Sequence, residues 1–219
     1  ALRQVAIHSA EMVDYLNNTG KIPAKIVLKP TLKSSDGVKE FMVEASANPN
    51  VIGVITWCHT FSPAKMWIRG LEVLTKPLLQ LATQHHKEIP WETIDMDFMN
   101  LNQAAQGDRE FGYIVSRLGI KRKVVVGHYT DPEVAEKLGT WARACAGWDA
   151  SNNMKVMRWG DNMRNVAVTE GDKTEAERVF GASINTWAVN ELVAAYDAVK
   201  DDQVKEIIED YKAKYDVDP

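Results

Sequence analysis

Residues 51–57, with the sequence VIGVITW, are the stretch that decides the fold. The run is almost entirely apolar, which is typical of a strand buried on both faces of a parallel sheet. We expect further strands at residues 25–28, 78–82 and 124–126, and helices at residues 2–16, 35–47, 63–74, 91–118 and 132–147. Strands that alternate with helices predict an α/β fold, an open parallel sheet with helices on both faces, of the Rossmann or flavodoxin-like kind.

A domain boundary is predicted at residues 150–153, where the sequence ASNN is polar and turn-forming. We therefore expect an N-terminal α/β domain at residues 1–152 and the start of a second, central α/β domain at residues 153–219. The second domain is expected to hold strands at residues 155–159, 166–169 and 182–187, and helices at residues 173–180, 190–199 and 202–215. The first predicted helix has no strand before it, although right-handed crossovers need one. The pattern thus predicts a missing first strand and a truncated second domain.

The composition is that of an ordinary globular protein, with 45% hydrophobic and 26% charged residues among 219. The formal net charge is −4 and the densest basic run is only Lys121-Arg122-Lys123, so binding to nucleic acid has no electrostatic support. No apolar run approaches the roughly 20 residues that a membrane span needs, and no membrane partner is expected. Two cysteines in apolar stretches suit reduced, buried thiols and a cytoplasmic location.

Motifs of several enzyme classes are absent from the sequence, among them the dinucleotide-binding glycine pattern, the Walker loop, H-E-x-x-H, C-x-x-C and G-x-S-x-G. None of the five histidines has a second ligand at metal-binding spacing on a predicted helix. His59 follows the strand at 51–57, at the edge where open α/β sheets bind ligands, so it is either a site-lining residue or a turn residue that holds the next helix. His85 and His86 follow another strand but are adjacent and expected to point apart, and His8 is expected to be half-buried or solvated.

Two polar segments are candidate binding loops. Residues 95–103, DMDFMNLNQ, combine carboxylate and amide groups, and amides offer sugar hydroxyls both donors and an acceptor. The alternative is an irregular helix, with Gly107 and Gly112 as the predicted breaks farther along. Residues 160–165, GDNMRN, follow the first strand of the second domain, which suits either a ligand loop or a structural turn capped by Asp161.

These segments resemble the L-arabinose isomerase family in order and spacing. The matching stretches are KIVLKP (25–30), WCHTFSPAKMW (57–67), KPLLQLATQ (76–84), IPWETIDMDFMNLNQAAQGDREFG (89–112), RWGDNMRNVAVTEGDK (158–173) and INTWAV (184–189). The resemblance runs from the start of the chain to about Tyr215, and the long match at 89–112 is the most specific.

The resemblance implies an aldose–ketose isomerase that interconverts L-arabinose and L-ribulose through a metal-assisted enediol, with D-galactose to D-tagatose as a second activity. It implies Mn²⁺ held by two Glu and two His outside this chain, so no catalytic residue or metal ligand is assigned here. It also implies a homo-oligomer, hexamer or tetramer, with a small sugar as substrate. Met163 matches the methionine that faces the sugar. The other candidates, which line the site or support it, are Gln103, Gln106, Asn162, Arg164 and His59.

The sequence leaves two alternatives to an L-arabinose isomerase fragment. A non-catalytic sugar-binding α/β module would also use parallel α/β domains with amide-rich clefts, but the expected missing strand and truncated second domain disfavour it. A relative of the fucose isomerases is disfavoured by the stretches at 57–67 and 89–112. The fragment by itself is expected to be inactive.

Overall fold

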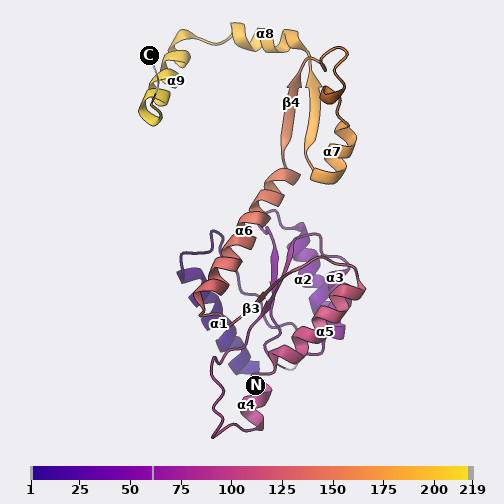
Figure 1. Cartoon of the computed structure of the whole chain (residues 1–219), viewed down its shortest axis with the longest axis vertical. Helices are drawn as coiled ribbons and strands as arrows, with labels where there is room; N and C mark the ends of the chain where they lie inside the picture. The colour runs from indigo at the N-terminus through magenta and orange to yellow at the C-terminus, as the bar shows by residue number, and fades with distance from the viewer. Residues whose placement is uncertain (1, 61, 217–219) are drawn as a thin grey trace. The chain divides into compact units, whose positions relative to one another are not determined.

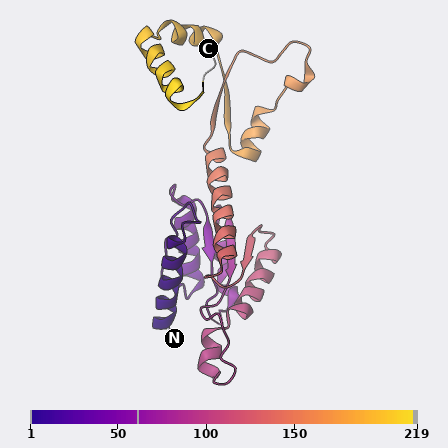
Figure 2. The same cartoon turned by 60° about the vertical axis from the view of Figure 1, so that its left-hand side comes forward.

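The computed structural model describes residues 2–60 and 62–216. The chain divides into two compact units, unit 1 at residues 1–149 and unit 2 at residues 150–219. The division falls inside a long helix, α6 (Pro132–Asn152). Figure 1 shows the elements in chain order, and Figure 2 shows the same ribbon after a turn about the vertical axis. Among the described residues, no helix is both long enough and apolar enough to cross a lipid bilayer.

Unit 1 is built around a parallel sheet of three strands in the order β1-β2-β3. The strands are β1 (Val54–Thr56), β2 (Leu78–Ala82) and β3 (Lys123–Val126). Val54 pairs with Leu78 across the first ladder, and Leu79 pairs with Lys123 across the second. Because the strands are parallel and the connections between them contain helices, the predicted α/β fold class is confirmed.

Helices cover both faces of this sheet, because successive side chains of β2 point to opposite sides. Leu78 belongs to one hydrophobic cluster, and Leu79 and Leu81 belong to the other. The Leu78 face is covered by α2 (Ser35–Ala47), η1 (Ala64–Trp67), α3 (Ile68–Leu71) and α5 (Ala104–Arg117). The other face is covered by α1 (Leu2–Asn18) and α6. The helices lie on the two sides of the sheet in Figure 1.

Local signals explain where several of these helices begin and end. The Ser34 side chain accepts a hydrogen bond from the Gly37 backbone N–H, as an N-terminal cap does. Asp95 caps the short helix α4 (Met96–Leu101) by accepting from the Phe98 N–H. Pro132 opens α6 at the first helical position, where its missing N–H has no consequence.

Residues 25–28 do not form the expected strand, because none of the described residues pairs with them as a neighbouring strand would. The Asn17 side chain takes the place of such a neighbour at Ile26. It donates to the Ile26 carbonyl at 3.0 Å and accepts from the Ile26 N–H at 2.8 Å. Val27, beside it, is 68% exposed. The stretch is therefore extended but outside the sheet.

The expected helix breaks at Gly107 and Gly112 are wrong, since both glycines lie inside α5. The real interruption is at Asn102 and Gln103, between α4 and α5. Gly107 serves packing instead: a Cβ there would lie 3.0 Å from the Cβ of Cys58. The absence of a side chain lets α5 approach the segment after β1, so the glycine marks a close contact and not a bend.

Unit 2 contains a parallel pair of strands, β4 (Lys155–Trp159) and β5 (Ser183–Trp187), joined through η2 (Ala167–Thr169) and α7 (Lys173–Phe180). The chain continues into α8 (Val189–Asp197) and α9 (Asp201–Lys214). The short strand expected at 166–169 is a 3-10 turn. Helix α6 also continues five residues beyond its expected end at Gly147, to Asn152.

Candidate functional site

Four histidines from three separate segments meet at the carboxyl end of the sheet in unit 1. His8 lies on α1, His59 follows β1, and His85 and His86 follow β2. We call these four residues the histidine cluster. The carboxyl ends of neighbouring parallel strands lie at one edge of a sheet, and that edge is where open α/β folds bind ligands. The histidine cluster is therefore the first candidate binding site in unit 1.

The imidazole rings of the cluster are in direct contact. His8 Nδ1 and His59 Nε2 share a hydrogen bond of 3.0 Å. The rings of His8 and His85 stack with centroids 3.5 Å apart and planes only 6° from parallel. His86 meets His85 edge-on, with centroids 4.9 Å apart. The Trp57 ring lies 4.6 Å from that of His59 and closes the cluster on the strand side.

Burial sets the protonation of these imidazoles. His59 is 5% exposed, and burial lowers its pKa to about 4, with His8 and His85 acting in the same direction. Burial also lowers the pKa of His8, and His85 adds to the effect. Removing an imidazolium from water is unfavourable, and a second positive charge nearby makes it more so. At neutral pH, His8 and His59 are therefore uncharged and act as hydrogen-bonding groups.

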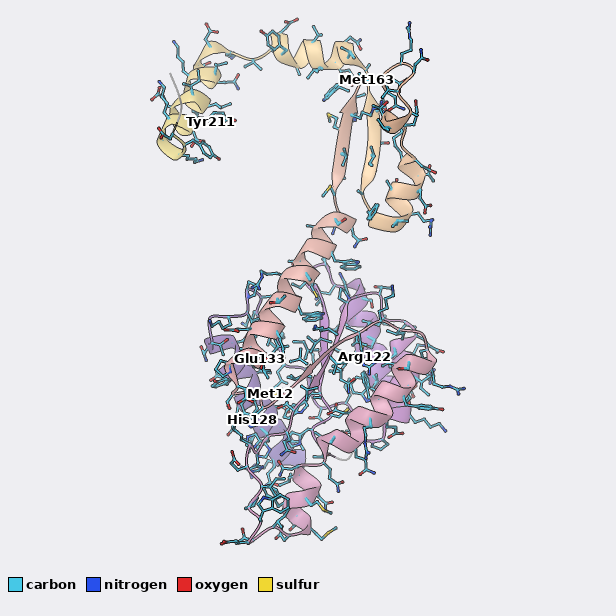
Figure 3. The ribbon with its side chains drawn as sticks, in the orientation of Figure 1. Met12, Arg122, His128, Glu133, Met163 and Tyr211 are labelled. Atoms are coloured by element: carbon cyan, nitrogen blue, oxygen red, sulfur yellow. The ribbon has the colours of Figure 1, made fainter. Side chains whose placement is uncertain are left out.

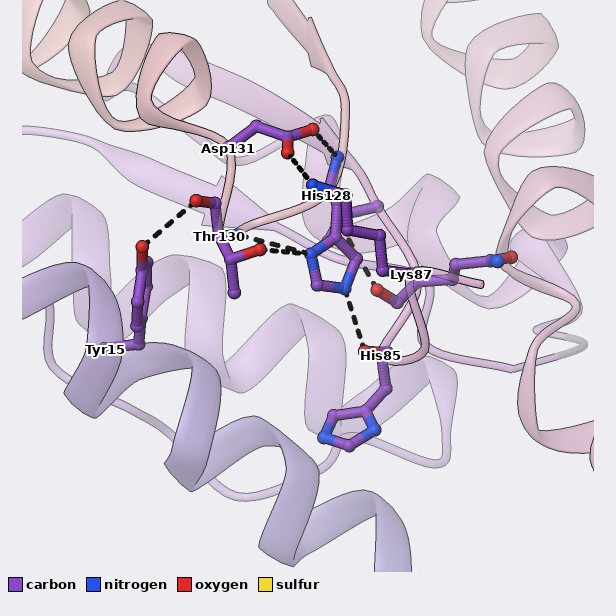
Figure 4. A network of polar contacts seen from close by, with 8 residues as sticks. Tyr15, His85, Lys87, His128, Thr130 and Asp131 are labelled. Carbon is purple, nitrogen blue, oxygen red and sulfur yellow. Dashed lines mark hydrogen bonds and ion pairs between the residues drawn. The ribbon is translucent and has the colours of Figure 1, made fainter. Parts of the chain in front are cut away.

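A loop between β3 and α6 packs beside the cluster, as Figure 4 shows. His128 Nε2 lies 2.9 Å from the His85 carbonyl oxygen, to which it donates, and its Nδ1 lies 2.7 Å from the Thr130 hydroxyl. The tautomer follows, because a carbonyl can only accept a hydrogen bond. The Asp131 carboxylate accepts a hydrogen bond from the backbone N–H of His128 at 3.1 Å and forms an ion pair with Lys87 at 2.6 Å. The loop fixes the backbone that carries His85.

A second polar group lies on the face of the sheet that carries Leu78. Gln80, in the middle of β2 and 3% exposed, donates to the Asp108 carboxylate at 3.0 Å and accepts from Arg122 Nε at 2.8 Å. Burial raises the pKa of Asp108 to about 6, and the hydrogen bond from Gln80 partly opposes it. Gln80 therefore links Asp108 of α5 to Arg122, the residue before β3, which is a structural role.

Neither group is a metal centre. Across the described residues, no three His, Cys, Asp or Glu side chains are arranged to hold an ion. Several ring nitrogens of the cluster already have partners: His8 and His59 bond each other, and His85 Nε2 faces the Glu11 carboxylate at 2.9 Å. The arrangement can exchange hydrogen bonds and protons, but it does not present converging lone pairs.

The structure places the two predicted amides of unit 1 away from the stacked rings. Gln103 is half-buried between α4 and α5 and makes no capping hydrogen bond, while Gln106 is exposed on α5. The neighbouring Asn102 makes the direct connection instead, since its side-chain oxygen lies 3.0 Å from His86 Nδ1. Of the three residues of this unit that the sequence suggested for the site, Gln103, Gln106 and His59, the cluster contains His59.

The remaining predicted residues lie in unit 2, on the loop after β4. Gly160 and Asn165 both have positive φ, 80° and 63°, so the loop is sharply curved at both ends. The backbone N–H of Asn162 donates to the Asp161 carboxylate, and the side-chain amide of Asn162 donates to the Glu170 carboxylate. Met163, labelled in Figure 3, is 65% exposed, and Arg164 beside it is exposed too. The loop presents Met163 and Arg164 to solvent.

Sequence reasoning missed the assembly of the histidine cluster, although signals for it exist. His59 and His85-His86 each follow a strand, and adjacent parallel strands bring such positions together. His8 lies three residues after Val5 and four before Met12, both buried on α1, so it belongs to the face that packs on the sheet. Treating each histidine alone concealed their proximity.

Comparison with known proteins gives a consistent result along the whole chain. A family model described as the L-arabinose isomerase N-terminal domain matches residues 1–153, and one described as the L-arabinose isomerase central domain matches residues 155–219. L-arabinose isomerases of Bifidobacterium adolescentis and Bifidobacterium animalis subsp. lactis are 91% and 81% identical over all 219 residues, which are 44% and 43% of those proteins. That of an Arthrobacter species is 57% identical over 218 residues. The chain spans less than half the length of these relatives.

Proposed function

The chain belongs to the L-arabinose isomerase family, and from that premise we propose that it works as part of a longer polypeptide that interconverts L-arabinose and L-ribulose. In this proposal the chain supplies the N-terminal α/β domain, residues 1–152, and the start of the central domain, residues 153–219. The observation that carries the proposal is the pair of family matches, which together cover the chain in the family's domain order. D-galactose to D-tagatose conversion is a second expected activity.

The contribution of this chain to the reaction is a binding surface. Met163 offers an exposed thioether and methyl group from the curved loop after β4, and Asn162 and Arg164 flank it with an amide and a guanidinium. A sugar presents C–H faces and hydroxyl edges, so an apolar contact beside hydrogen-bonding groups suits it. We assign substrate contact to Met163 and a supporting role to its two neighbours. In unit 1, taken by itself, we propose Gln103, Gln106 and His59 as site-lining or supporting residues.

The family implies a divalent metal, Mn²⁺. The residues described here do not fit it, since none of their His, Cys, Asp and Glu side chains form a ligand group. We therefore assign no metal ligand and no catalytic residue to this chain and place no proton-transfer step on its side chains.

We also propose that the protein acts as a homo-oligomer, hexamer or tetramer. The segment between β2 and α5 supports this, because it exposes large apolar side chains that a monomer leaves in water: Trp91 is 79% exposed and Met96 is 64% exposed. Exposed apolar groups close together mark surfaces that bind protein.

The buried free thiols Cys58 and Cys145 agree with the proposed cytoplasmic location.

An isomerisation assay tests the proposal. The complete polypeptide that contains this chain, supplied with Mn²⁺, should form L-ribulose from L-arabinose, whereas the 219-residue chain alone should form none. Turnover by the chain alone would overturn the assignment of catalysis to other segments. Sugar binding without turnover by the complete polypeptide would favour the sugar-binding module instead.

Met163→Ala in the complete polypeptide should raise the KM for L-arabinose or change the preference between pentose and hexose, because a contact with the sugar is lost. Val168→Ala is the matched control, since Val168 is a 92% exposed apolar residue of the same connection. Unchanged kinetics in Met163→Ala would remove this residue from the site.

A further inference from the structure

Helix α1 is attached to the sheet by two kinds of contact. Its middle and C-terminal turns rest on the apolar face through Met12 and Leu16, which are buried. Its N-terminal half is attached through the buried Val5, an apolar contact of the same kind, and through His8, which is hydrogen-bonded to His59 and stacked on His85. The first kind of contact is insensitive to pH. The second depends on imidazoles that pack as neutral rings.

We propose that the histidine cluster is an acid-sensitive latch, in which neutral imidazoles hold the N-terminal half of α1 on the carboxyl ends of β1 and β2, and protonation releases it. The hydrogen bond between His8 and His59 needs a lone pair on one of the two nitrogens. When both rings are protonated, two N–H donors face each other at 3.0 Å. A proton on His8 also places a positive charge against the His85 ring, which stacks on it with centroids 3.5 Å apart.

The charged groups around the cluster do not cancel this repulsion. From α1, Glu11 faces His85 at 2.9 Å and is the carboxylate in contact with the rings. From the loop after β2, Lys87 is positive but is paired with Asp131 of the β3–α6 loop. That same loop contributes His128, whose two ring nitrogens are bonded to Thr130 and to the His85 carbonyl, and Tyr129, whose ring lies 6.1 Å from that of His85. From the far side, His86 is bonded to Asn102.

The Glu11 carboxylate is hydrogen-bonded to His85 and not to His59. Glu11 also favours a proton on His8, which opposes the effect of burial there. His59 faces no carboxylate among the residues described, so a proton on its ring has no compensating charge. His59 is also enclosed by Trp57 and buried, with its Nδ1 making no hydrogen bond within the described part of the chain. A proton on that nitrogen would gain no acceptor unless the ring moved out. Protonation of His59 therefore favours movement of the N-terminal half of α1 away from the sheet.

The direction of the pH effect follows from the folded and unfolded states. The pKa of His59 is about 4 in the folded chain and about 6.5 when exposed, so the open state binds more protons between these values. The contribution of the latch to stability is thus fully present above about pH 6.5 and decreases as the pH falls toward 4. Linkage at His59 alone favours opening by about tenfold or more between about pH 7 and about pH 5.

Amide hydrogen exchange of α1 tests the latch, with α2 as the internal reference because it packs on the other face of the sheet. After correction for intrinsic exchange, the protection of the N-terminal half of α1 should fall by about tenfold or more relative to α2 between about pH 7 and about pH 5. Equal changes in the two helices would overturn the proposal.

His8→Gln is the main variant, because glutamine keeps a donor toward His59 but cannot become positive. It should reduce the acid-induced loss of protection in α1, because the positive charge that faces His59 is gone, while the part of the response that comes from the burial of His59 remains. His128→Gln is the matched control, since it removes a histidine of the same region that does not stack on His8, and it should keep the wild-type pH response. If His8→Gln does not fold, His85→Phe retains the stacked ring without a titratable nitrogen and should weaken the response. A full acid response in a folded His8→Gln or His85→Phe variant contradicts the latch.

Discussion

Unit 1 encloses two hydrophobic clusters around its sheet, whereas unit 2 leaves almost all of its apolar side chains in water. In unit 1, side chains such as Phe111, Leu79 and Val38 have no exposed surface. In the described part of unit 2, Ala182 is the single buried residue, and Tyr196 and Ile207 on its helices are 78% and 55% exposed. The two units share the α/β alternation but not the core that normally stabilises it.

The difference shows that a repeated secondary-structure pattern does not by itself produce stability. A two-stranded sheet is only marginally stable in water. It buries too little apolar surface to offset the conformational entropy that is lost when the chain becomes ordered. The apolar stripes of α8 and α9 have the spacing of buried helical faces, yet neither stripe is covered within the described chain. Unit 2 is thus expected to gain its stability from contacts beyond those seen here.

The largest expected effect comes from a pair of side-chain substitutions to alanine, one in each unit. Phe111→Ala in unit 1 should lower the free energy of unfolding by about 3–5 kcal/mol, because it opens a cavity beside Trp67 in a closed cluster. Ile207→Ala in unit 2 should change it by less than about 0.5 kcal/mol, since the side chain is largely exposed. Chemical denaturation of the chain measures both. A large loss from Ile207→Ala would contradict the contrast between the units.

Much of unit 1 could be predicted because its signals are local. Strand β2 was predicted at its observed bounds, and α2 begins beside its serine cap as expected. Residues 25–28 show the limit of such signals: their composition suits a strand, but pairing requires a neighbour that a local pattern cannot supply. Gly107 shows a second limit, because a glycine inside a helix can mark either a break or a close approach, and only the position of Cys58 decides which.

The candidate site was less predictable because it depends on distances along the fold. His8 and His59 are 51 residues apart in the sequence, and their hydrogen bond follows from the packing of α1 on the sheet. The loop around Met163 was located correctly as the segment after β4, since a glycine followed by polar residues is a local signal. Its proposed contact with a sugar rests on the resemblance, which matches Met163 to a residue that faces the substrate.

A smaller effect should locate where the dense packing of unit 1 ends along α6. A Cβ at Gly139 would lie 2.2 Å from the Lys21 carbonyl oxygen, whereas one at Gly147 would meet nothing within 4 Å. Gly139→Ala should therefore destabilise the chain by about 2 kcal/mol through overpacking against backbone. Gly147→Ala, in the same helix, should stabilise it by about 0.5–1 kcal/mol because alanine loses less conformational entropy in a helix. Thermal unfolding of the two variants compares them, and destabilisation by both would extend the tightly packed region toward unit 2.

The smallest effect concerns the buried carboxylate of unit 1. Burial raises the pKa of Asp108 to about 6 in the folded chain, above its value of 3.8 in the unfolded chain. The folded state therefore prefers the protonated acid, and stability falls as the pH rises from about 4 through 6. Asp108→Asn keeps the oxygen that accepts from Gln80 but removes the charge. It should stabilise the chain at about pH 7 by about 1 kcal/mol, a value reduced for solvent screening because the side chain is only partly buried.

The same substitution has almost no effect below about pH 3, where Asp108 is already neutral in both states. Asp161→Asn in unit 2 is the matched control, because that side chain is 94% exposed, and it should change stability by less than about 0.5 kcal/mol at either pH. Denaturant titrations at the two pH values separate the outcomes. Equal stabilisation by Asp108→Asn at both pH values would mean that the effect arises from packing and not from the buried charge. That result would remove one of the electrostatic differences between the two units while leaving the difference in their cores.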